Sequence, residues 1–484
     1  MYIGIDLGTS AMKGIVVNKN GIVIRQASAS YDVLCPHPGW TEQNPSDWVD
    51  ALHNVLSSLL SDEIRTQIKG ISFSGQMHGL VAVDKKGQVI RPCILWNDAR
   101  TEKQTEYLNT VIGKSTLCEC TGNIAFAGFT APKLLWLKDN EPHNFDRIHK
   151  IMLPKDYLAY VLTGNIATDF SDASGTLLLD VKNKRWSDKM LDICGLSLQQ
   201  LPLLHESYDC IGFITSKVAT QYGLSRDVKV VIGAGDNAAA AIGMGAVRDG
   251  DCNISLGTSG TIFVCSDRYV ADETCALHNF AHANGKWHTM GCILSAASCR
   301  KWWIENILQS DDYDGDEFSA ADKMCDGLLF LPYLRGERSP HNDVQARGAF
   351  IGLTAETTRG QMSRAVMEGV AFAIRDCLEA AKSSGVVPKS ATLCGGGAKS
   401  RVWRQILADV LAMPIRVSHA EQGPSLGAAI LAMVGCGEFS CVEEAVERMS
   451  KQCDEIVPNI SCISAYDVAY RRYARLYPTL KGLF

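Results

Sequence analysis

An acidic residue among small ones is the strongest candidate for catalysis in this sequence. Residues 233–237 (GAGDN) follow the apolar run 229–232, which predicts a turn from a strand into a helix. Asp236 would then have room for a substrate beside its carboxylate. In phosphoryl transfer, positioning and charge neutralisation contribute most of the catalysis, so an ordinary Asp suffices as general base for an attacking hydroxyl. We predict this role for Asp236, with a helix N-cap as the alternative.

Two turns of the same sequence are suited to phosphate. Leu7-Gly8-Thr9-Ser10 and Leu256-Gly257-Thr258-Ser259 each lie between two β-rich runs. Backbone N–H groups and hydroxyls in such a turn can form a concavity for phosphate oxygens, although a plain hairpin turn is the alternative. Asp6 comes just before the first turn, and a carboxylate repels a phosphate unless a cation intervenes. Asp6 is therefore a candidate ligand of Mg²⁺.

A third glycine-rich segment is predicted to contact a nucleotide. Residues 394–400 read Cys394-Gly395-Gly396-Gly397-Ala398-Lys399-Ser400, after a strand-like run at 391–393 and before a predicted helix. Glycines let the backbone approach a flat or charged ligand, and a helix N-terminus favours anions. The segment matches neither the dinucleotide fingerprint nor the Walker loop.

Polar and aromatic groups at the ends of two predicted strands suit a polyol. Residues 75–79 (GQMHG) contain Met77 and His78, and residues 94–100 (ILWNDAR) contain Trp96. Hydrogen-bonding groups beside a flat apolar wall are what a sugar pocket needs, although His78 could equally be a structural histidine.

Other residues are weaker candidates for a functional role. His278 and His282 have the spacing of metal ligands on a helix, but their surroundings look strand-like and no third ligand is evident. Trp302 and Trp303 are predicted to lie in the core. Residues 331–341, rich in charge and turn formers, are interpreted as a salt-bridged loop.

The elements around these residues predict an α/β fold. Residues 2–6, 12–18, 22–31, 68–73 and 89–96 are expected to be strands, and helices are expected from Pro45 and over 361–384, 401–412 and 427–434. An Asp-rich stretch at 310–316 is expected to be a surface loop. The repeat of LGTS at half the chain length indicates duplication of a domain.

Composition narrows the class of protein. The chain has 484 residues, 46% of them hydrophobic, and a formal net charge of −6, which disfavours nucleic acid and anionic membranes as partners. The start MYIGID is predicted to be a strand, and we therefore expect no signal peptide. The 18 cysteines form no CxxC pair, so we expect free thiols in a cytoplasmic protein.

Taken in order, these motifs resemble the FGGY carbohydrate kinases of the actin-like ATPase superfamily. The resemblance rests on IGIDLGTS at the start, GAGDNAAAA, the second LGTSG, CGGGAKS, and the longer segments 128–140 and 348–368. It implies two actin-like (ribonuclease H-like) domains around a deep cleft, with a duplicated ATPase core. Residues 1–247 would form the sugar-binding domain and residues 248–484 the nucleotide-binding domain.

The resemblance also implies roles for individual residues. Asp236 would be the catalytic base, and Met77, His78, Trp96, Asn237 and Asp236 would contact the sugar. ATP would lie against Gly8-Thr9-Ser10, Gly257-Thr258-Ser259 and Gly395 to Lys399, with Mg²⁺ at Asp6.

Within the family, residues 75–79, 94–100 and 331–341 resemble members that phosphorylate D-xylulose. Glycerol-specific members carry Arg-Glu where this chain has Met77-His78, which disfavours glycerol. Another ketose, a deoxyketose or gluconate is the closest alternative, and an actin-like regulator driven by nucleotide is a more remote one. Family members often form dimers, so the resemblance favours a homodimer.

Overall fold

The computed structural model describes residues 1–270, 275–321, 327–417, 423–449 and 454–484. The described chain forms two compact α/β units. Unit 1 contains residues 1–247, 279–287 and 420–450, and unit 2 contains residues 248–278, 288–419 and 451–484. The fold class is thus the α/β class that the sequence predicts, with one sheet as the centre of each unit.

Unit 1 is built on a sheet with the strand order β13-β14-β5-β1-β2-β3. β1, β5 and β14 run parallel, and β2, β3 and β13 are antiparallel to their neighbours. The strands are β1 Tyr2–Leu7, β2 Ala11–Val17, β3 Val23–Ser30, β5 Gly70–Gly75, β13 Cys210–Phe213 and β14 Lys229–Gly235.

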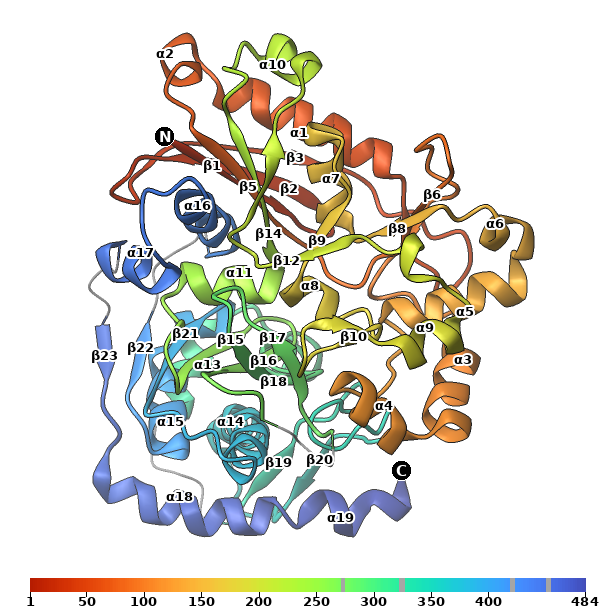
Figure 1. The fold of residues 1–484 in the computed structure, drawn as a ribbon. Helices are drawn as coiled ribbons and strands as arrows, with labels where there is room; N and C mark the ends of the chain where they lie inside the picture. The colour runs from red at the N-terminus through yellow and green to blue at the C-terminus, as the bar shows by residue number, and fades with distance from the viewer. Residues whose placement is uncertain (271–274, 322–326, 418–422, 450–453) are drawn as a thin grey trace. The chain divides into compact units, whose positions relative to one another are not determined.

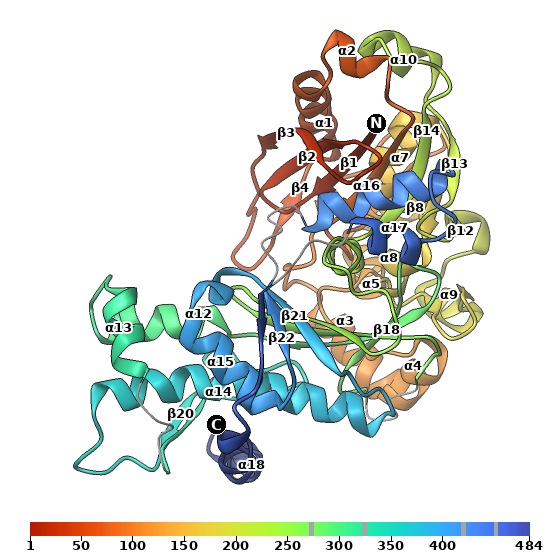
Figure 2. The ribbon, with the colours of Figure 1, turned by 90° about the vertical axis from the view of Figure 1, so that its left-hand side faces the viewer.

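Helices cover both faces of this sheet. α1 Pro45–Leu59 and α7 Pro154–Thr163 pack with Ile3 and Ile5 in one core cluster. α11 Asp236–Gly243 and α16 Gly423–Gly435 pack against the other face, and α16 lies beside β1 although more than 400 residues of sequence separate them (Figures 1 and 2). The packing there is close, because a Cβ on Gly4 would come within 2.0 Å of the carbonyl oxygen of Ser425.

The sequence explains α1 directly. Pro45 is suited to the first turn, because it has no N–H to leave unpaired. Trp48, Leu52 and Leu56 recur at helical spacing and are almost completely buried. Burial of each such side chain contributes roughly 1.5–3 kcal/mol.

Unit 2 repeats the central part of that topology. Its sheet contains β18-β16-β15-β21-β22-β23 in this order; β15 pairs antiparallel with β16 and parallel with β21, as β1 pairs with β2 and β5. This agrees with the duplication that the two LGTS turns predict. The strands are β15 Asp251–Leu256, β16 Gly260–Ser266, β18 Trp287–Ile293, β21 Ser390–Cys394, β22 Ile415–Val417 and β23 Asp454–Ile456.

The long helix α14 Arg359–Ser383 packs with α15 Arg401–Leu411 and α18 Ile460–Tyr473 in the core of unit 2. The shorter helical segments of the chain are α2 Asp62–Arg65, α3 Glu102–Tyr107, η1 Leu108–Gly113, α4 Lys114–Thr121, α5 Thr130–Asn140, α6 Pro142–Asp146, α8 Phe170–Ser174, α9 Asp188–Cys194, η2 Leu198–Gln200, α10 Ser216–Tyr222, α12 Ala297–Lys301, η3 Trp302–Ile307, α13 Tyr313–Ala320, η4 Gly396–Lys399, α17 Val442–Met449, α19 Leu476–Leu480 and η5 Lys481–Leu483. The shorter strands are β4 Glu42–Gln43, β6 Val81–Val83, β7 Cys93–Ile94, β8 Lys150–Met152, β9 Ala167–Asp169, β10 Leu179–Asp180, β11 Arg185–Trp186, β12 Leu203–His205, β17 His278–Ala281, β19 Leu329–Leu331 and β20 Ala349–Ile351.

Three expectations from the sequence need correction. Only Cys93–Ile94 of the expected strand 89–96 is a strand, and Pro92, which cannot donate to a ladder, directly precedes it. The expected loop 310–316 ends early because α13 begins at Tyr313, where Asp312 caps the helix by accepting from the N–H of Gly315 at 2.8 Å. Free thiols are wrong for Cys118 and Cys275, which are disulfide-bonded; sequence spacing alone does not reveal such bonds.

Candidate active site

In unit 1 the register of three parallel strands brings the predicted catalytic segments to one edge of the sheet. Leu7 at the end of β1 pairs with Gly75 at the end of β5, and Gly75 pairs with Gly235 at the end of β14. The segments that follow these strands carry the turn 8–10, Met77-His78 and Asp236-Asn237. The carboxyl ends of parallel strands are where open α/β sheets bind their ligands.

Asp236 is the first residue of α11, and Gly235 occupies the N-cap, so the alternative role of Asp236 as N-cap is wrong. Burial, with the nearby charge of Asp6, raises the pKa of Asp236 to about 7. The side-chain amide of Asn237 donates to Asp236 Oδ1 at 3.1 Å. A carboxylate whose pKa lies near neutrality is suited to general base catalysis.

Asp6 lies on β1 beside Ser74 of β5, whose hydroxyl donates to Asp6 Oδ1 at 2.9 Å. Burial raises the pKa of Asp6, and its charge in turn raises the pKa of Asp236. Two carboxylates that repel each other at a strand edge fit a divalent cation, and Mg²⁺ commonly takes only one or two protein carboxylates plus water and phosphate. In the described part of the chain no group of three or more His, Cys, Asp or Glu residues forms a metal site, which is compatible with that sparse coordination.

His78 is held by contacts on its backbone and its ring. It adopts a left-handed backbone conformation with φ of 70°, which is uncommon outside glycine. Its carbonyl accepts from Lys133 Nζ at 2.7 Å and from the Thr130 hydroxyl at 3.1 Å. The ring stacks on Phe129, and Nδ1 lies 2.7 Å from the carbonyl oxygen of Gly175. Because a carbonyl oxygen can only accept a hydrogen bond, Nδ1 carries the hydrogen in this contact, and neutral His78 has its acceptor lone pair on Nε2.

Met77 and Trp96 are the other two aromatic or apolar residues predicted to contact a polyol. Met77 is buried and its sulfur lies 3.9 Å from the amide nitrogen of Asn237. The indole of Trp96 is 42% exposed, although its N–H donates to the hydroxyl of Thr9 at 2.9 Å. That bond places an exposed aromatic side chain beside the first LGTS turn.

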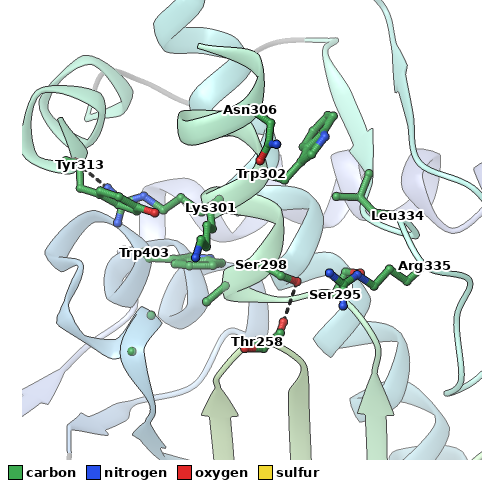
Figure 3. Close-up of a pocket in the computed structure, with 14 residues that line it drawn as sticks. Thr258, Ser295, Ser298, Lys301, Trp302, Asn306, Tyr313, Leu334, Arg335 and Trp403 are labelled. Atoms are coloured by element: carbon green, nitrogen blue, oxygen red, sulfur yellow. Dashed lines mark hydrogen bonds between the residues drawn. The ribbon is translucent and has the colours of Figure 1, made fainter. Parts of the chain in front are cut away.

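Unit 2 contains a cavity of about 710 Å³ (Figure 3). Ser255 on β15 pairs with Cys394 on β21, so the second LGTS turn and the glycine-rich segment leave the sheet at the same edge. The lining residues are Thr258, Ser295, Ala297, Ser298, Arg300, Lys301, Trp302, Asn306, Tyr313, Leu334, Arg335, Gly396, Gly397 and Trp403. A cavity of a few hundred to a thousand Å³ suits a ligand the size of a nucleotide.

The predicted nucleotide residues are only partly in the cavity wall. Thr258, Gly396 and Gly397 line it, whereas Gly257, Ser259, Gly395, Ala398 and Lys399 are not among the lining residues. Gly395 has a backbone role, because its φ is 88° and a Cβ there would come within 2.6 Å of the carbonyl oxygen of Leu256. Space is open at Gly396, where a Cβ would meet nothing within 4 Å.

Several lining residues were not predicted from the sequence. The Ser298 hydroxyl donates to the carbonyl of Thr258 at 2.7 Å, which joins α12 to the LGTS turn (Figure 3). Trp303 lies in the core as predicted, whereas Trp302 is only partly buried: it packs against the core and also lines the cavity. Adjacent residues of a helix point about 100° apart, and this geometry is the signal that could have separated the two.

The structure also tests the interpretations of the segment 331–341 and of His282. The segment 331–341 is more buried than a salt-bridged loop: Glu337 is 1% exposed, and its carboxylate accepts from the backbone N–H groups of Leu294 and Arg338. His282 is buried and its Nε2 lies 3.0 Å from the carbonyl oxygen of Ala246, so a backbone contact accounts for it without a metal.

Comparison with known proteins identifies the family. The model of the N-terminal domain of the FGGY family of carbohydrate kinases matches residues 1–243, and the model of its C-terminal domain matches residues 252–436. The chain belongs to the FGGY family of carbohydrate kinases. It is therefore an ATP-dependent carbohydrate kinase with two domains of the actin-like ATPase class.

Individual FGGY kinases are similar over their whole length. Xylulose kinase of Escherichia coli (strain K12) is 40% identical over 486 residues, with 100% of both chains covered. The crystal structure of a xyloylose kinase from Brucella ovis has a TM-score of 0.95 at 41% identity and covers 100% of both chains. A gluconate kinase from Lactobacillus acidophilus has a TM-score of 0.92 at 27% identity, covering 99% of this chain and 98% of that one.

Among the helices described here, none is both apolar enough and long enough to cross a membrane.

Proposed function

We propose that this chain transfers the γ-phosphoryl group of ATP to the terminal hydroxyl of D-xylulose, giving D-xylulose 5-phosphate and ADP. The observation that carries the proposal is the meeting of Asp236, Met77 and His78 at one strand edge of unit 1. The full-length similarity to proteins named xylulose kinase supports the choice of sugar.

In this proposal the sugar binds at the strand edge of unit 1. The hydroxyl to be phosphorylated donates to Asp236, whose pKa of about 7 lets it accept the proton as the oxygen attacks phosphorus. Another sugar hydroxyl donates to Nε2 of His78, and the indole of Trp96 forms an apolar wall. After transfer, the proton on Asp236 passes to solvent when the product leaves.

ATP occupies the cavity of unit 2 in this proposal. Trp302 and Tyr313 supply aromatic faces for the adenine ring of ATP, and the cationic side chains of Lys301 and Arg335 suit its phosphates. Asp6 would hold Mg²⁺, which when bound neutralises charge on the transferring phosphoryl group. A cytoplasmic location and a homodimer stay predictions from the sequence.

The variant Asp236→Asn tests the role of the base, because it keeps the side-chain shape and removes the proton acceptor. We expect kcat to fall at least 1,000-fold while ATP still binds with its original Kd. Asp62→Asn is a matched control, because the side chain of Asp62 is 96% exposed on the surface. Turnover by Asp236→Asn at the rate of the control would contradict the assignment.

Gluconate is the second candidate substrate. The observation that favours it is the gluconate kinase of Lactobacillus acidophilus, with a TM-score of 0.92 to this chain. A sugar acid carries a carboxylate that D-xylulose lacks, so the two candidates separate in a direct comparison of kcat/KM.

A further inference from the structure

Unit 1 contains a fully buried cluster of charged side chains that the proposed mechanism does not use. It consists of Lys155 on α7, Asp156 beside it, Asp169 at the end of β9 and Asp172 on α8, and each of these side chains is 0% exposed. Lys155 Nζ lies 2.6 Å from Asp156 Oδ1, 2.8 Å from Asp169 Oδ1 and 3.6 Å from Asp172 Oδ2.

A contribution to the stability of the fold does not by itself explain such a cluster. Buried ion pairs often contribute less than a packed apolar group of the same volume, because each charge loses its hydration. The cluster also has one ammonium group for three carboxyl groups. Burial raises the pKa of Asp156 and of Asp172, and the charge of Asp236 adds to the rise at Asp172. The cluster therefore lies within electrostatic reach of the proposed base.

A chain of hydrogen bonds leads from this cluster to the peptide before Asp236. Asp169 Oδ2 accepts from the Ser171 hydroxyl at 2.5 Å and from the Ser171 backbone N–H at 2.9 Å. The Ser171 oxygen in turn accepts from the backbone N–H of Gly235 at 3.1 Å. All of these groups are buried, and Gly235 is joined directly to Asp236.

The direction of these bonds fixes the hydroxyl of Ser171. Its proton is committed to Asp169, and so its lone pairs face the N–H of Gly235. Asp169 in turn is oriented by Lys155 and caps α8. The N–H of Gly235, the residue directly before the base, is thus held by the hydroxyl oxygen of Ser171.

We propose that Ser171 is a positioning residue for the catalytic base: held by Asp169 and Lys155, it fixes the peptide of Gly235 and with it the carboxylate of Asp236. This inference rests on the proposed role of Asp236 as base. Displacement of a reacting group by about 1 Å can cost 100-fold in rate, so the expected effect is on kcat.

The chain offers a matched control in Ser207. Its hydroxyl also donates to Asp169 Oδ2, at 2.6 Å, and it is equally buried, but it does not touch the N–H of Gly235. Ser171→Ala and Ser207→Ala therefore remove the same kind of bond to the same oxygen. Only Ser171→Ala also removes the acceptor of Gly235.

The experiment measures kcat, both KM values and Tm for the two variants in the full chain, in a coupled assay for ADP. We expect Ser171→Ala to lower kcat 10- to 100-fold, with KM for sugar and ATP within threefold of the parent. Ser207→Ala is expected to keep kcat within threefold of the parent and to lower Tm by about as much as Ser171→Ala does. Ser171→Cys, which keeps the volume and is a weaker acceptor, should lie between Ser171→Ala and the parent in kcat.

Equal kcat in the two alanine variants would overturn the proposal, because the loss would then follow the bond to Asp169 alone. If Ser171→Ala does not fold, Ser171→Cys decides: kcat equal to that of the parent would also overturn it. Failure of this inference is distinguishable from failure of the proposed function. The former leaves Asp236→Asn inactive, whereas the latter leaves that variant active.

Discussion

Replacement of the buried Lys133 by methionine is expected to weaken sugar binding through His78. Lys133 is 0% exposed, and its Nζ donates to the carbonyl oxygens of His78 and Gly128, each at 2.7 Å. Methionine fills similar volume and donates nothing. His78 would keep only the bond from Thr130, at 3.1 Å.

The magnitude follows from two opposing terms at His78. A left-handed backbone costs a non-glycine residue about 1–2 kcal/mol. A hydrogen bond from a charged donor contributes about 1.5–3 kcal/mol. Burial lowers the pKa of Lys133 to about 7, so the amine is only partly charged at neutral pH and the lower half of that range applies. Loss of about 2 kcal/mol of restraint would let His78 leave its position and would weaken the sugar complex roughly 30-fold.

The assay is the release of ADP as a function of sugar concentration. We expect the KM for the sugar to rise about 30-fold and the KM for ATP to stay within twofold. Lys138→Met is the matched control, because Lys138 is an exposed residue of the same helix α5. An unchanged KM for the sugar in a folded Lys133→Met variant would refute the link between Lys133 and His78.

Three further predictions concern the cavity of unit 2, the buried Asp376 and the close packing at Gly233. Lys301→Met removes a cation from the cavity of unit 2 and should raise the KM for ATP three- to tenfold without changing the KM for the sugar. Burial raises the pKa of Asp376 from 3.8 to about 7. Ionisation of this carboxyl group therefore favours the unfolded state, and the free energy of unfolding falls as pH rises from about 4 to about 7. Asp376→Asn should raise Tm more at pH 8 than at pH 5, and an equal rise at both would contradict this. Gly233→Ala should lower Tm by more than 10 °C, because a Cβ there would come within 1.8 Å of the carbonyl oxygen of Phe73. Gly113→Ala is the control: φ is positive there too, at 94°, but a Cβ would meet nothing within 4 Å, so Tm should fall by a few degrees only.

Regular periodicity allowed much of the fold to be predicted from the sequence. The expected strands 2–6, 12–18 and 22–31 correspond to β1, β2 and β3, because alternation and turn residues set their limits. The expected helices 361–384 and 401–412 correspond to α14 and α15, which carry apolar residues at helical spacing. The repeated LGTS turn predicted duplication of a domain, and β15 pairs with β16 and β21 as β1 pairs with β2 and β5.

The candidate site could be predicted where a short motif contains the whole feature. GAGDN at 233–237 predicts the strand-to-helix junction that the structure contains. The contacts of His78 could not be predicted, because Lys133 and Gly175 are distant in sequence and meet only in the fold. The same is true of Ser171, whose partner Gly235 lies 64 residues further along the chain.

A panel of sugars tests most directly whether this kinase acts on D-xylulose. ADP release is measured with D-xylulose, D-ribulose, L-ribulose, L-fuculose, gluconate and glycerol, and without sugar. We predict that D-xylulose gives the highest kcat/KM by at least tenfold and that ADP release without sugar is negligible. A higher kcat/KM for gluconate or another sugar would contradict the assigned substrate, and equal ADP release without sugar would contradict the kinase mechanism itself.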